Sequence, residues 1–115
     1  MGELQTSVST IFGVLRANYI RGNYRVALDL AGAIRQYSSR EGIKPPEKLE
    51  MMEQTSLVGR IMEILEEVDC LRADSSRNRE IEILIDQANA YYSKIVWDGY
   101  KTTAETKIKE MMLKL

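Results

Sequence analysis

The spacing of the apolar residues is the feature that most constrains this fold, because they recur at steps of three and four through nearly the whole chain. Residues three or four apart lie on one face of an α-helix, so the spacing predicts helices with one buried side. No stretch alternates between apolar and polar residues as a half-buried strand does. The sequence therefore predicts an all-α protein.

Glycine, proline and polar residues divide this pattern into five expected helices. Gly22 and Gly42 should end the first two, since glycine accepts the left-handed conformation that closes many helices. Pro45 and Pro46 exclude helix just before them and favour a new helix after them. The expected helices cover residues 4–22, 23–42, 47–72 and 77–97, followed by about three turns from Thr102, which has capping-box spacing to Glu105.

The chain of 115 residues is too short for two cores of ordinary size, so we expect residues 1–115 to form one domain. Four main helices and a short C-terminal helix, joined by short connections, predict an antiparallel helical bundle. The terminal helix is able to close the bundle, to cover a groove or to exchange with a second copy, which would give a homodimer.

The charge and cysteine content indicate the setting of the protein. A net charge of −1 weakens the case for nucleic acid or an anionic membrane as a partner. No apolar run is long enough to span a bilayer, and the N-terminus lacks the pattern of a signal peptide. The single cysteine, Cys70, lies within the apolar pattern, so we expect a buried thiol in the reducing cytoplasm.

The absence of histidine removes the commonest general base, the usual zinc sites and the Ser–His and Cys–His nucleophile pairs. The chain also has no phosphate-binding loop. Acidic residues at helical spacing, such as Glu63, Glu66 and Glu67, leave a carboxylate metal enzyme open, but a solvated acidic face explains them more simply. We therefore expect no catalysis, cofactor or metal.

Two groups of residues are candidates for binding. Six basic residues of the first hairpin alternate with tyrosines, a mixture that suits a nucleic-acid backbone through charge and stacking; alternatively, the tyrosines fill the seam between the helices. The two methionines of each adjacent pair, Met51/Met52 and Met111/Met112, cannot both point inward. Flexible thioethers suit grooves that receive partner helices; alternatively, and more commonly, they fill gaps in a core. The six basic residues are Arg16, Arg21, Arg25, Arg35, Arg40 and Lys44.

The group Tyr19, Gly22, Tyr24 and Ala27 resembles the corner of a tetratricopeptide repeat. The microtubule-interacting-and-transport (MIT) domain is similar over the same residues, 8–41, and residues 47–72 would supply its third helix. The resemblance implies a groove beside the third helix that takes a peptide tail. The chain departs from the repeat pattern at Ala31 and at residue 34, and it has no second repeat.

The sequence thus predicts a non-catalytic protein–protein interaction module, an adaptor or regulator that binds a peptide or helix of a partner. The alternative is a small nucleic-acid-associated regulator that uses the basic hairpin from Arg16 to Lys44. The residues expected at the partner surface are Arg16, Tyr19, Arg21, Arg25, Met51, Met52, Glu66, Met111 and Met112.

Overall fold

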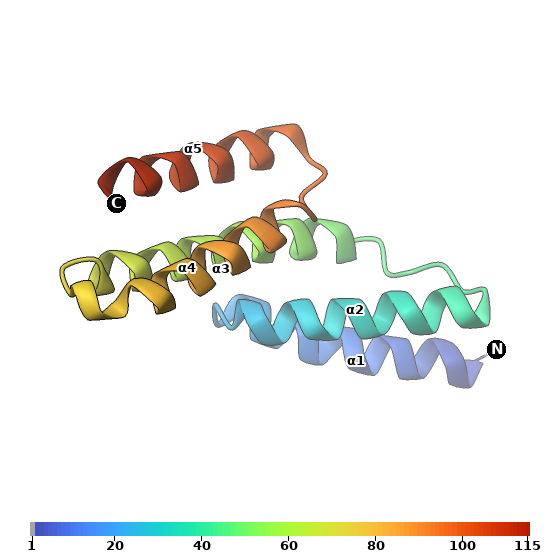
Figure 1. The fold of residues 1–115 in the computed structure, drawn as a ribbon. Helices are drawn as coiled ribbons and strands as arrows, with labels where there is room; N and C mark the ends of the chain where they lie inside the picture. The colour runs from blue at the N-terminus through green and yellow to red at the C-terminus, as the bar shows by residue number, and fades with distance from the viewer. Residues whose placement is uncertain (1) are drawn as a thin grey trace. The chain divides into compact units, whose positions relative to one another are not determined.

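The computed structural model describes the backbone of residues 2–115 and the side chains of residues 7–115, so the side chain of Leu4 lies outside the described part. No strand occurs in this range, and the prediction of an all-α helical bundle is confirmed. The helices are α1 (Gly2–Ile20), α2 (Tyr24–Glu41), α3 (Leu49–Leu71), the 3-10 turn η1 (Ser75–Arg77), α4 (Asn78–Tyr92) and α5 (Asp98–Lys114) (Figure 1).

The chain forms two compact units, Met1–Ser56 and Leu57–Leu115. The boundary lies inside α3, so the first two turns of that helix belong to the first unit and the remainder to the second. That residues 1–115 behave as one domain stays a prediction.

The first unit is built on the antiparallel hairpin of α1 and α2 (Figure 1). The small side chains of Ala27 and Ala31 are buried, which lets the two helices approach closely. Tyr19 is half-buried, and its hydroxyl donates to Sδ of Met51 at 3.7 Å. The buried cluster of this unit comprises Val8, Leu15, Ala27, Ala31, Ile34, Leu49 and Met52.

Two glycines close the helices of this hairpin, as the sequence predicts. Gly22 and Gly42 have φ of 78° and 67°, in the left-handed region. The N–H groups of Gly22 and Asn23 donate to the carbonyls of Tyr19 and Asn18, and the residues around Gly42 repeat this arrangement. Both ends are therefore Schellman motifs, which satisfy carbonyls that a helix end otherwise leaves unpaired.

An ion pair links α2 to the start of α3 within the first unit. The Arg35 guanidinium donates from Nε to both carboxylate oxygens of Glu53, at 3.0 and 2.9 Å, and its Nη2 lies 2.8 Å from Oε1. These hydrogen bonds raise the pKa of Arg35, against the opposing effect of partial burial. Arg35 is thus engaged within the fold, and the net contribution of such a partly exposed pair to stability is about 0.2–1 kcal/mol.

The second unit draws its core from α3, α4, α5 and the segment before α5. The buried residues of each helix recur at steps of three and four, so each helix presents one apolar face to this core. They are Leu57, Ile61, Ile64, Leu65 and Val68 of α3, Ile81, Ile85 and Ala88 of α4, and Ala104, Ile108 and Met111 of α5, together with Ile95.

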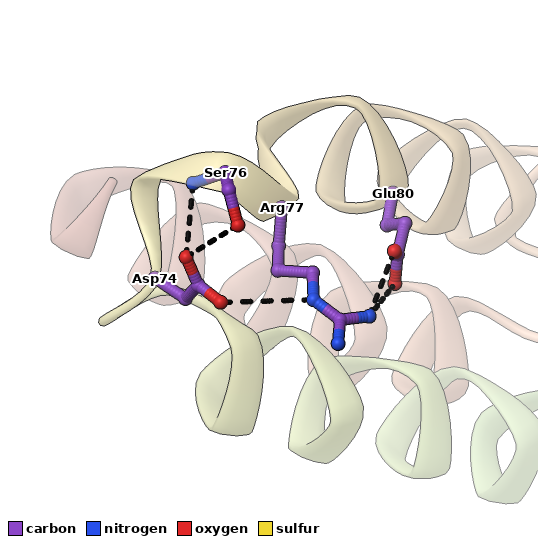
Figure 2. A network of polar contacts seen from close by, with 4 residues as sticks. All are labelled: Asp74, Ser76, Arg77 and Glu80. Atoms are coloured by element: carbon purple, nitrogen blue, oxygen red, sulfur yellow. Dashed lines mark hydrogen bonds and ion pairs between the residues drawn. The ribbon is translucent and has the colours of Figure 1, made fainter.

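A polar turn reverses the chain between α3 and α4 (Figure 2). Oδ1 of Asp74 accepts hydrogen bonds from the backbone N–H and the hydroxyl of Ser76, at 3.0 and 2.6 Å. Arg77 lies between two carboxylates, 3.6 Å from Asp74 and 2.8 Å from Glu80. Asp74 therefore caps η1, and the hydrogen bonds from Ser76 lower its pKa below the ordinary value.

The predicted boundary between the last two helices is wrong. α4 ends at Tyr92, five residues before the expected end at Trp97, and α5 begins at Asp98 rather than Thr102. The amides of Lys94 and Ile95 donate three residues back, so the helix tightens and ends, while the side chain of Ile95 is buried. α5 has 17 residues and is not a short helix.

The expectation that Cys70 is buried is also wrong, because its side chain is exposed. Cys70 follows the buried Val68 by two positions, which places it about 200° around the helix, on the opposite face.

Candidate partner-binding groove

A groove of about 200 Å³ runs along the second unit between α3 and α5. Each set of lining residues falls within eight consecutive positions at steps of three, one and three, so each set forms one face of its helix over about two turns. The lining residues are Met62, Leu65, Glu66 and Asp69 of α3 and Lys107, Glu110, Met111 and Lys114 of α5.

The floor of the groove is apolar and deformable. Leu65 and Met111 are buried, whereas Met62 is 37% exposed. An unbranched thioether changes rotamer easily, so two methionines on one floor allow the groove to adapt to side chains of different shape.

The two walls carry charges of opposite sign. Glu66 on α3 and Lys114 on α5 form no ion pair with any side chain among residues 7–115. By contrast, Asp69 is 2.6 Å from Arg72, and Lys107 is 3.7 Å from Glu110. Each wall therefore keeps one charge that the fold itself does not neutralise.

Exposed apolar residues continue beyond the groove at the end of α5. Met112, Leu113 and Leu115 are all exposed, and Leu113 is 88% accessible. Met111 is buried beside the exposed Met112, as the prediction for adjacent methionines requires. In the other pair, Met52 is in the core of the first unit, and Met51 is half-buried and packs against that core.

The structure places the sequence-predicted binding residues in two groups. Glu66, Met111 and Met112 belong to the second unit, and the first two line the groove. The remaining six belong to the first unit, where only the arginines are exposed; they are Arg16, Tyr19, Arg21, Arg25, Met51 and Met52.

A second hollow, of about 190 Å³, lies between α4 and α5 and includes Asn89 and Ile108. Its charges neutralise each other: Lys109 is 2.8 Å from Glu105, which also accepts a hydrogen bond from the Tyr92 hydroxyl at 3.4 Å. The hydrogen bond that Lys109 donates to Glu105 lowers the pKa of Glu105 and raises the pKa of Lys109. This hollow therefore offers a partner less unsatisfied charge than the α3/α5 groove.

The described part of the chain holds neither a metal-binding cluster nor a membrane-spanning helix. No group of three acidic or cysteine side chains there is arranged to hold a metal ion. Within residues 2–115, no helix has the length and apolar character needed to cross a membrane.

Comparisons of the sequence with protein-family models and with curated proteins, and of the structure with solved structures, found no match.

Proposed function

We propose that this chain is a non-catalytic protein–protein interaction module, an adaptor or regulator that binds a helix or peptide of a partner in the α3/α5 groove. The observation that carries the proposal is an apolar, methionine-containing floor between walls whose Glu66 and Lys114 have no ion-pair partner in the described structure. Such a surface offers both burial and charge to a second chain.

The size and chemistry of the groove support a protein partner over a metabolite. Its volume, about 200 Å³, lies below the ~300–1,000 Å³ typical of small-molecule sites. Its eight lining residues comprise three apolar and five charged side chains, with no hydroxyl or thiol nucleophile among them. The groove lies between α3 and α5, and α5 is outside the residues that carry the MIT resemblance.

Affinity capture from the native cell tests this function. We expect the unmodified chain to retain a partner protein and Glu66→Lys to retain less of it, by up to about fivefold, since an exposed ion pair contributes up to about 1 kcal/mol. Arg16→Glu, a charge reversal of opposite sign in the first unit, should retain the partner fully. Loss with Arg16→Glu and retention with Glu66→Lys would contradict the proposal.

A nucleic-acid-associated regulator is the second candidate, and one observation favours it. Arg16, Arg21 and Arg25 are exposed and form no ion pair with the described side chains, whereas Arg35 is engaged by Glu53. If these arginines contact phosphates, affinity for a single-stranded oligonucleotide should fall steeply as salt rises. Binding of an apolar helix in the groove should depend on salt far less.

A further inference from the structure

The unsatisfied charges of the groove lie on opposite sides of its apolar floor. Glu66 is on the α3 wall, and Lys114 is on the α5 wall. Because the opposite charges of the ion pair between Lys107 and Glu110 cancel, the net charge of the α5 wall is set by Lys114. On the α3 wall, Asp69 is neutralised by Arg72, so the net charge there is set by Glu66.

We propose that the occupant of this groove is an amphipathic helix with two differently charged edges. Its apolar stripe lies on the floor, basic residues border the stripe on the edge that meets α3, and acidic residues border it on the edge that meets α5. This inference rests on the proposed function and adds the charge pattern of the partner.

The geometry of the lining residues supports a helix. The lining positions run from 62 to 69 on α3 and from 107 to 114 on α5, or about 10 Å along each helix axis. This length matches about two turns of a partner helix, whose side chains at steps of three and four would reach the floor together. A partner with one sign of charge on both edges would meet like charge at one wall, which weakens binding.

Three stapled helical peptides test the charge pattern. All carry the same leucine stripe, and their edges are lysine and glutamate, lysine on both sides, or glutamate on both sides. We expect the mixed peptide to bind the unmodified protein about two- to fivefold more tightly than either uniform peptide, since each wall contributes one exposed ion pair. Fluorescence anisotropy gives the affinities, and the methyl NMR signals of Met62 and Met111 report whether the groove is occupied.

Single charge reversals should change the preferred peptide. Glu66→Lys makes both walls basic and should favour the peptide with glutamate on both edges. Lys114→Glu makes both walls acidic and should favour the peptide with lysine on both edges. Glu67→Lys and Lys101→Glu make the same changes in net charge on exposed positions of the same helices outside the groove, so they should keep the preference for the mixed peptide.

The outcomes separate this inference from the proposed function. If all three peptides shift the Met62 and Met111 signals with equal affinity, the charge pattern is wrong and helix binding in the groove stands. If no peptide shifts these signals, both proposals fall. If the protein alone sediments as a dimer, and dilution shifts the same methyl signals, the occupant is a second copy and the inference is overturned.

Discussion

At the scale of single residues, Asp74 has the best-defined electrostatic role in the structure. Hydrogen bonds from Ser76 hold its pKa below the ordinary value of 3.8, so its charged form is favoured by folding. Its contribution to stability is present above the unfolded pKa and is lost as pH falls through the lower folded pKa. Asp74→Ala should therefore reduce stability at pH 7 and pH 5, with a smaller difference from the unmodified protein at pH 3.

Urea denaturation followed by circular dichroism at the three pH values checks this prediction. Asp86→Ala is the control, since Asp86 is an exposed aspartate of α4 without an ion pair in the described structure. It should change stability little at any pH. A loss for Asp74→Ala that stays the same at pH 3 would mean that the charged cap is not the cause.

At the scale of helices, the glycines at their ends test whether backbone conformation decides stability. A Cβ at Gly42 or Gly22 would meet no atom within 4 Å, but both have positive φ. Alanine there should cost about 1–2 kcal/mol because an L-residue is strained in the left-handed region. Gly32, inside α2, also has open space and lacks this conformation; alanine there should stabilise by about 0.5–1 kcal/mol.

Urea denaturation of the three single variants measures these differences. The decisive result is that the free energy of unfolding falls for alanine at Gly22 and Gly42 and rises for alanine at Gly32. The substitution is the same at all three sites, and none of them is sterically closed. Destabilisation of similar size at Gly32 would show that something other than φ sets the cost of the added methyl group.

The helix ends also show how far local sequence signals reach. Gly22 and Gly42 were predictable because the left-handed conformation strongly favours glycine. The end of α4 was not, because Ile95 fits the helical apolar spacing although it is buried from a non-helical segment. The capping-box spacing at Thr102 does not mark a helix start. Thr102 lies inside α5, and its hydroxyl donates to the carbonyl of Asp98 at 3.0 Å, as threonines do inside helices.

The groove was predictable only in part. Glu66 and Met111 were recognised from their charge and their place in a methionine pair, and both line it. Met62, Asp69 and Lys114 were missed, together with Leu65, Lys107 and Glu110. Their spacing marks one face on each helix, but the two faces are about 40 positions apart in sequence, and local periodicity does not say which helices pack together.

At the scale of the whole molecule, α3 belongs to both compact units. It continues from Leu49 to Leu71 across the boundary after Ser56. Units of this size are marginally stable on their own, and fraying of α3 in one unit removes helical support from the other. We therefore expect one cooperative unfolding transition for the chain.

A core substitution in the first unit, observed from the second, tests this coupling. Ile34 is fully buried, so Ile34→Ala should cost about 2–5 kcal/mol. The only tryptophan, Trp97, lies in the second unit, 5.2 Å from the ring of Tyr100. If the units unfold as one, Trp97 fluorescence and circular dichroism should show the same lowered urea midpoint. An unchanged Trp97 transition, with an earlier loss of helix, would instead mean two domains, each with its own stability.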